Sequence, residues 1–101
     1  MNNWKNLQEM IEYPSDGILS KDILKNEKFD ATLFIMAKGA DLSEHTSTRA
    51  GIVHVIDGKG IFNLEDEAIK MRPGVFIHMG KNAIHSLRAE ENTAFVLILF
   101  N

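Results

Sequence analysis

The sequence predicts an all-β protein, a jelly-roll sandwich or small barrel preceded by one short helix. From residue 17 onward, Gly and clusters of Asp, Asn or Lys interrupt the chain about every eight to twelve residues, a spacing typical of sandwiches and barrels. Between these turns, apolar and polar residues alternate with the period of two expected for strands. About nine short strands in one small chain are best closed as two packed sheets, because closure protects the strand edges.

Helical periodicity is confined to residues 3–12. Apolar side chains recur there three and four residues apart, at Trp4, Leu7, Met10 and Ile11. The Tyr-Pro-Ser-Asp-Gly segment that follows ends the helix, since proline removes a backbone donor and glycine supplies turn geometry. We therefore divide the chain into a helical segment, residues 1–16, that packs on a barrel formed by residues 17–101.

Each strand is expected between two turn signals. The predicted strands are 17–24, 29–37, 43–48, 51–57, 60–65, 67–72, 75–80, 83–90 and 94–100. Segment 94–100, AFVLILF, is apolar at every position, which indicates burial on both faces. Such a strand is either central in its sheet or packed against a second subunit, and together with Trp4 it predicts a homodimer.

Composition limits the classes of partner. The chain has 101 residues, enough for one domain, and its 45% apolar and 25% charged residues are those of an ordinary globular protein. A net charge of −3 does not favour a nucleic-acid partner, and zero Cys excludes thiolate metal sites. No signal peptide or membrane-length apolar run is visible, so we expect a cytoplasmic protein without a membrane partner.

Two glycine and histidine patterns resemble the motifs of the cupin superfamily. The first cupin motif runs Gly, five residues, His-x-His, three or four residues, Glu, six residues, Gly. Here Gly39 is followed after five residues by His45, and Gly58 closes the motif in IVHVIDG. Ser47 stands in place of the second His, and Gly51 in place of the Glu.

The second cupin motif runs Gly, five residues, Pro-x-Gly, two residues, His, three residues, Asn. Gly74 begins the match and His85 falls at the position of the motif His. Gly80 and Asn82 stand at the Pro and Gly positions, and Ala89 stands at the final Asn. The resemblance, to small stand-alone cupins with a degenerate metal motif, implies a double-stranded β-helix, the RmlC-like jelly-roll barrel.

The resemblance places His45 and His85 on adjacent strands, facing into the barrel. Of the four usual metal ligands only these two remain, whereas stable sites usually have at least three protein ligands. Two interpretations stay open: a pair hydrogen-bonded within the barrel, or a site for a divalent metal (Zn, Ni, Fe or Mn) completed by water or substrate. No cofactor is certain. His54 and His78, on neighbouring strands, are expected to be packing residues.

The expected pocket combines these histidines with nearby polar and apolar side chains. Its candidate residues are His45, Ser47, His85, Arg49, Phe34 and Met79. We expect Phe and Met to form an adaptable apolar wall. Arg49, in the bend after the first motif strand, is the candidate for attracting an anionic ligand.

Three functional hypotheses follow. The first is a module that binds a small organic ligand in the barrel with weak or no metal binding. The second is a metal-dependent enzyme of the isomerase or dioxygenase type that uses the two histidines, and the third is a structural homo-oligomer without a ligand. Catalytic residues, ligand identity and reaction are not predicted by the sequence, and whether the protein is an enzyme stays open.

Overall fold

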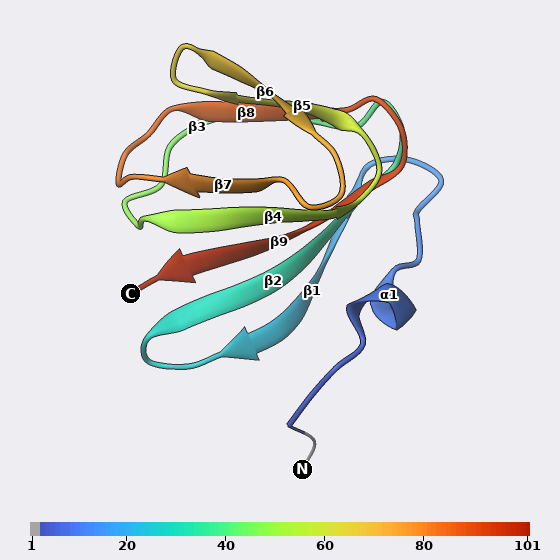
Figure 1. The fold of residues 1–101 in the computed structure, drawn as a ribbon, viewed down its shortest axis with the longest axis horizontal. Helices are drawn as coiled ribbons and strands as arrows, with labels where there is room; N and C mark the ends of the chain where they lie inside the picture. Colours follow the sequence, from blue (N-terminus) through green and yellow to red (C-terminus); the bar gives the residue numbers. More distant parts are fainter. Residues whose placement is uncertain (1–2) are drawn as a thin grey trace.

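A computed structural model describes residues 3–101 and shows one short helix followed by nine strands (Figure 1). Residues 1 and 2 of the predicted N-terminal segment lie outside the described residues. In chain order the elements are α1 (Leu7–Met10), β1 (Ile18–Lys25), β2 (Phe29–Met36), β3 (Asp41–His45), β4 (Gly51–Asp57), β5 (Gly60–Leu64), β6 (Glu67–Met71), β7 (Phe76–Met79), β8 (His85–Ala89) and β9 (Thr93–Phe100).

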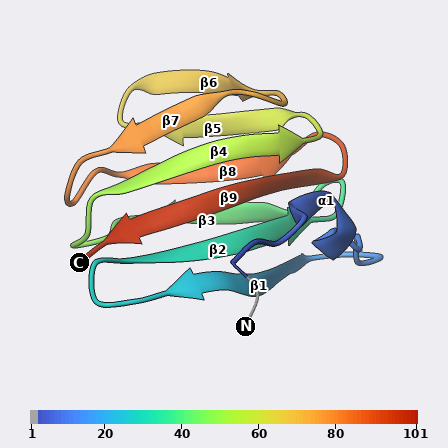
Figure 2. The same cartoon turned by 60° about the horizontal axis from the view of Figure 1, so that its bottom comes forward.

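The strands form two antiparallel sheets packed face to face. One sheet has the order β1-β2-β9-β4-β7 and the other the order β3-β8-β5-β6. Figure 2 shows β9 lying between β2 and β4, so this strand joins the two halves of the larger sheet. The predicted all-β jelly roll with a short N-terminal helix is therefore confirmed.

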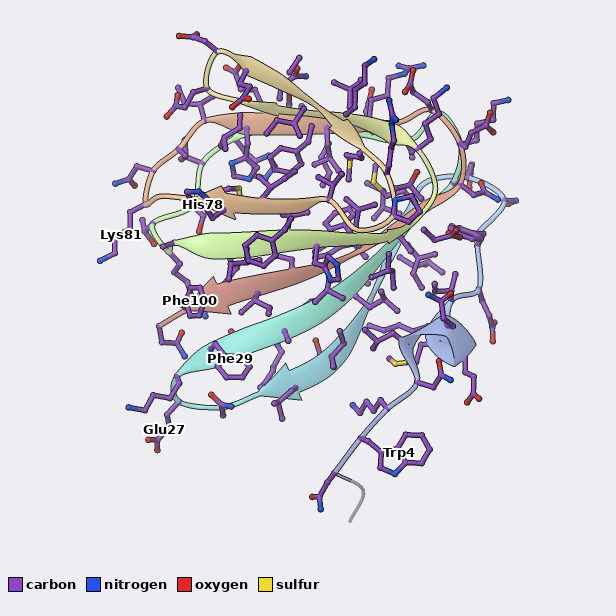
Figure 3. All side chains as sticks on the ribbon, in the orientation of Figure 1. Trp4, Glu27, Phe29, His78, Lys81 and Phe100 are labelled. Atoms are coloured by element: carbon purple, nitrogen blue, oxygen red, sulfur yellow. The ribbon has the colours of Figure 1, made fainter. Side chains whose placement is uncertain are left out.

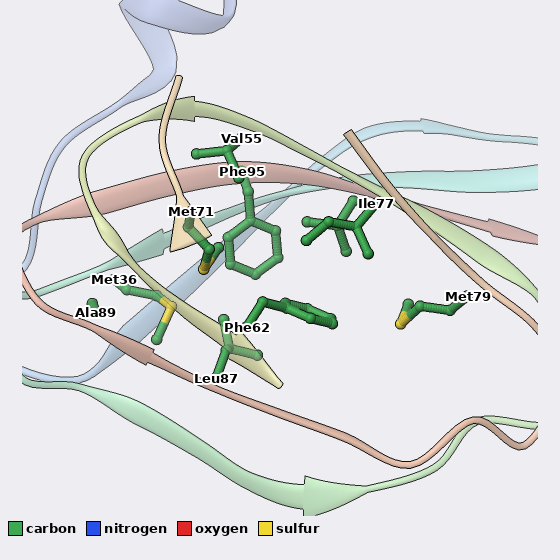
Figure 4. Close-up of a cluster of buried hydrophobic side chains, with 10 residues drawn as sticks. Met36, Val55, Phe62, Met71, Ile77, Met79, Leu87, Ala89 and Phe95 are labelled. Carbon is green, nitrogen blue, oxygen red and sulfur yellow. The ribbon is translucent and has the colours of Figure 1, made fainter. Parts of the chain in front are cut away.

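Alternation along the strands assigns each side chain to a face. In β4, Val53 and Val55 point into the core while His54 is exposed, as the period of two requires. Apolar side chains pack between the sheets, with Phe62 and Phe95 at the centre of the cluster (Figure 4). Met36 and Met71 lie at one end of this cluster and Met79 at the other.

Strand β9 is buried on both faces, as its sequence predicts, and part of the reason lies within the chain. Its outward-facing Ala94 and Val96 are 0% and 8% exposed. They belong to a second apolar cluster with Leu33 and Ile35, against which the N-terminal segment packs. Leu7, Met10, Ile11 and Tyr13 are the covering residues of that segment. A partner subunit is thus not needed to explain these two positions.

The N-terminal helix is shorter than predicted. It spans only Leu7–Met10, capped at its start by the Asn6 side chain, which accepts from the backbone N–H of Gln8. Ile11 is already extended, because residues 11–13 run along the sheet rather than continuing the helix. Trp4 is 75% exposed and lies away from the barrel (Figure 3), so it does not cover the sheet.

The third strand ends earlier than the predicted 43–48. It spans Asp41–His45, and the following loop is held by contacts that the sequence does not reveal. The backbone N–H of Asn82 donates to the carbonyl of Ser47 at 2.7 Å, and that of Arg49 donates to the Ser47 hydroxyl at 3.1 Å. The Ser47 carbonyl and the Arg49 N–H, which a longer strand could have paired with a neighbouring strand, are therefore already hydrogen-bonded.

Within residues 3–101, no helix has both the length and the apolar character needed to cross a bilayer.

Candidate functional site

A cavity of about 220 Å³ lies between the two sheets. Both sheets contribute inward-facing side chains, and most of them are apolar. The lining residues are Phe34, Leu42, His45, Val53, Phe62, Met79, His85, Leu87, Phe95 and Leu97. The two histidines are the only lining residues with polar side chains, so they are the side chains available for polar recognition inside the cavity.

Strand pairing brings His45 and His85 together. They face each other across β3 and β8, and their ring centroids lie 4.1 Å apart with an interplanar angle of 61°. His85 is 8% exposed and stacks on Phe62, with centroids 5.8 Å apart and ring planes 4° from parallel. His45, at the end of β3, is exposed. The pair therefore connects the apolar interior with the solvent-facing end of the cavity.

Hydrogen bonds to the backbone define which ring nitrogens are free. Nδ1 of His45 lies 2.7 Å from the carbonyl oxygen of Ser43, and Nδ1 of His85 lies 3.0 Å from that of Ala83. A carbonyl oxygen can only accept, so each Nδ1 carries the proton and donates. In the neutral ring Nε2 is then an unprotonated acceptor. The site thus has two neighbouring histidines whose Nε2 atoms are not used by these backbone contacts.

Four of the six predicted pocket residues line the cavity: Phe34, His45, Met79 and His85. Phe34 stacks on Phe95 with ring centroids 5.2 Å apart, so it supports an aromatic wall. Ser47 lies outside the lining, in the loop described above.

Arg49 also lies outside the lining, and its guanidinium is engaged elsewhere. Nη1 donates to the Asp30 carboxylate at 3.0 Å, Nη2 to the carbonyl of Leu99 at 2.9 Å and Nε to that of Phe100 at 3.2 Å. These contacts tie the ends of β2 and β9 together. The predicted role of Arg49 in attracting an anion into the pocket therefore has no geometric support.

The cavity includes six lining residues that were not among the predicted pocket residues: Leu42, Val53, Phe62, Leu87, Phe95 and Leu97. Their inward direction is visible in the alternation of each strand. They share one cavity because strands that are far apart in the sequence pair with each other. A single sequence does not show that pairing.

The other two histidines lie on the outer face of the larger sheet. In the pairing of β4 with β7, Ile52 is opposite His78 and His54 is opposite Phe76. Both histidines are exposed, and the ring centroids of His54 and Phe76 lie 6.5 Å apart. They lie on neighbouring strands as the sequence predicts, and neither lines the cavity. The expected packing role is not observed, because both side chains face outward from the sheet.

The donor set does not fit a resident metal. No group of three or more His, Cys, Asp or Glu side chains with metal-binding geometry occurs among residues 3–101. His45 and His85 are two donors where stable sites usually have three, and the Ser47 hydroxyl already accepts from the Arg49 backbone. At Gly51, an added Cβ would lie 2.8 Å from the carbonyl oxygen of Ile98 and 2.9 Å from Leu99 Cδ2. The Glu position of the motif has therefore been closed by packing.

A two-sheet jelly roll with paired histidines directed from β3 and β8 toward an internal cavity is the architecture of single-barrel cupins. The cupin domain family matches residues 32–101, and the chain belongs to this family. A comparison with curated proteins found no match.

Solved structures support the fold. The chain is similar to a conserved protein of unknown function from Streptococcus pyogenes, with TM-score 0.88 and 21% identity over 100% of this chain and 89% of that one. It is similar to a cupin 2 conserved barrel domain protein from Leptotrichia buccalis, with TM-score 0.87 and 28% identity over 96% of this chain and 47% of that one. A salicylate 1,2-dioxygenase mutant from Pseudoaminobacter salicylatoxidans gives TM-score 0.77 and 13% identity over 82% of this chain and 26% of that one.

Proposed function

We propose that this cupin binds a small organic ligand in the barrel cavity, with weak or no metal binding. The observation that carries the proposal is a cavity of about 220 Å³ with apolar walls and two histidines whose Nε2 atoms remain available. A concave, mostly apolar site with a few convergent polar groups is the usual form of a small-molecule site. Because the Nδ1 bonds hold both rings in place, little ordering is needed when a ligand arrives.

Thermal unfolding of metal-depleted protein across a metabolite panel tests the proposal. A ligand present at a hundred times its dissociation constant stabilises the native state by about 2.7 kcal/mol. For a domain of this size that corresponds to an increase in Tm of roughly 10 °C or more. The variant Leu97→Phe, which enlarges a lining side chain, is expected to lose the shift. His78→Ala, on the outer face, should keep it.

If no member of a broad panel raises the Tm of the metal-depleted protein, the proposal fails and the homo-oligomer without a ligand becomes the better interpretation. A shift that persists unchanged in Leu97→Phe would place the ligand elsewhere and would also count against it.

One observation favours a metal-dependent enzyme as the second candidate. Metal-ligating histidines generally donate their other ring N–H to a backbone carbonyl or carboxylate, as His45 and His85 do. In this candidate, substrate oxygens or water would supply the missing donors. It requires an activity that chelators abolish and an added divalent metal restores, whereas ligand binding that is insensitive to chelators supports the first candidate.

A further inference from the structure

The size of the cavity limits the ligand to about one ring. A dry apolar cavity of about 150 Å³ is sufficient for benzene, and drug-sized ligands occupy sites of about 300 Å³ or more. The cavity of about 220 Å³ lies between these values. A six-membered ring with one or two small substituents therefore matches the volume, and a disaccharide or a nucleotide does not.

The lining favours a flat, apolar body. Eight of the ten lining residues are apolar, and three of these are phenylalanines. Phe62 lies parallel to the His85 ring, and Phe34 lies parallel to Phe95. Ring faces and edges on both sheets are thus available for offset or edge-to-face contact with another aromatic ring.

The polar end of the cavity selects neutral hydrogen-bond donors. No Lys, Arg, Asp or Glu is among the lining residues, and Arg49 is bound to Asp30 and two carbonyls. An anion would therefore lose its hydration without meeting a fixed cation, which is unfavourable. In their neutral form His45 and His85 instead offer two Nε2 acceptors, on rings whose centroids lie 4.1 Å apart. Acceptors on two neighbouring rings suit a ligand with two donors on adjacent atoms.

We propose that the preferred ligand class is a neutral single-ring aromatic with two adjacent hydroxyl groups, a vicinal dihydroxybenzene. Its ring would lie among Phe34, Phe62 and Phe95, and its hydroxyl groups would donate to Nε2 of His45 and His85. This inference rests on the proposed ligand-binding function and adds the chemistry of the ligand. It needs no metal and no covalent step.

Binding of catechol and of 1,2-dimethoxybenzene to the same protein provides the test. The two compounds share the ring and the substitution pattern, but the dimethyl ether has no donor. Titration calorimetry is done on metal-depleted protein in EDTA and without oxygen, because catechol chelates metals and oxidises. We expect catechol to bind at least about tenfold more tightly, the combined effect of two neutral hydrogen bonds.

Two variants remove the acceptors while keeping aromatic rings. In His45→Phe and in His85→Phe one acceptor remains, so the preference for catechol over its dimethyl ether should fall to about threefold, with the affinity for the ether little changed. In the double variant it should fall to nearly onefold. His54→Phe and His78→Phe are the matched controls on the outer face, and they should keep the tenfold preference. Cooperative unfolding of each variant shows that the comparison is made between folded proteins.

Each other outcome has a defined meaning. Equal affinity for catechol and its ether overturns the donor inference while leaving a ligand-binding cavity in place. The same conclusion follows if neither compound binds but another small molecule raises the Tm. Catechol binding that appears only after a divalent metal is added overturns the inference in favour of a chelate. If nothing binds, the inference and the proposed function both fail.

Discussion

At Gly51, the position of the motif Glu, the carboxylate is absent and its space is also occupied by neighbouring atoms. The glycine is buried and faces inward, in register with Met79 on β7 and Leu99 on β9. Its missing side chain has not left a vacant ligand position, because the Ile98 carbonyl and the Leu99 side chain approach within 3 Å of where a Cβ would be. Reintroducing a carboxylate at this residue would require the sheet to move.

We expect Gly51→Ala to lower the free energy of unfolding by about 1–3 kcal/mol, because a side chain is forced into a packed region. Gly80→Ala is the matched control, since a Cβ there meets nothing within 4 Å and the backbone needs no left-handed conformation. The control should change stability by less than about 0.5 kcal/mol. Urea unfolding measures both, and equal stability of the two variants would contradict the packing argument.

The two-histidine donor set also predicts a low metal content. Protein purified without added metal should contain well under one equivalent per chain, because two imidazoles are one donor short of a stable site. Elemental analysis by mass spectrometry measures this directly. Stoichiometric Zn, Ni, Fe or Mn that is absent from His45→Ala and retained in His78→Ala would show the prediction to be wrong.

Two other motif positions show how residue identity follows from backbone conformation. Gly58, retained from the first motif, has φ +93, and a Cβ there would lie 2.2 Å from the carbonyl oxygen of Asn92. Asn82 replaces the glycine of the second motif and has φ 65. Asn is among the residues that adopt this region most readily, so the replacement keeps the turn. The turns of the motifs have thus been kept, while two of the four usual ligand positions carry Ser47 and Gly51.

The N-terminal segment is held on the larger sheet by a polar contact as well as by apolar packing. Tyr13 donates its hydroxyl proton to the Asp57 carboxylate at the end of β4. Burial, together with the hydrogen bond and the negative charge of Asp57, raises the pKa of Tyr13 above its ordinary value. The native state therefore holds this proton more tightly than the unfolded chain does.

This contact predicts a loss of stability at high pH. The contribution of Tyr13 is complete below the unfolded pKa of about 10 and is lost as the pH rises further. Tyr13→Phe should cost about 1 kcal/mol at pH 7, and the difference from the unsubstituted protein should shrink above pH 10. Denaturant unfolding as a function of pH measures the difference.

Tyr13 is the chain's single tyrosine, so its ultraviolet absorbance reports its ionisation directly. Titration at the pKa of a free phenol would contradict the expected effect of Asp57.

Strand positions were predictable from the sequence because local patterns determine them. All nine strands occur near their predicted ranges, since alternation and turn residues are visible without tertiary information. The helix was predicted too long because two apolar residues that fit the helical spacing lie outside it: Trp4 is exposed, and Ile11 is extended and packs on the sheet. The roles of Ser47 and Arg49 were not predictable, because their partners Asn82, Asp30 and Leu99 are distant in sequence.

At the scale of the whole molecule, the homodimer stays a prediction. Part of the outer face of the larger sheet is not covered by the N-terminal segment, and it carries Phe76, which is 61% exposed, beside His54. Ile52, in register with Ile98 on β9 and His78 on β7, continues this surface. Apolar surface of this kind is suited to contact with a second copy of the chain.

Sedimentation at micromolar concentration tests the dimer. We expect a dimer for the unsubstituted protein and a shift toward monomer in Phe76→Lys, because the variant places a charge in the contact. Leu24→Lys changes another exposed apolar residue, 51% exposed on the edge strand β1, and serves as the control. A monomer for the unsubstituted protein would refute the prediction.

Because β9 lies at the centre of the larger sheet, that sheet cannot form completely until residues 93–100 have been synthesised. Strands β2 and β4 do not pair with each other, and each forms its ladder with residues 93–100 instead. During synthesis, one edge of each strand therefore waits without a partner until residue 100 has left the ribosome. Sheets that depend on such distant pairing fold slowly and expose strand edges meanwhile. We expect chains that stop before Thr93 to aggregate more readily than residues 1–101, which light scattering would measure.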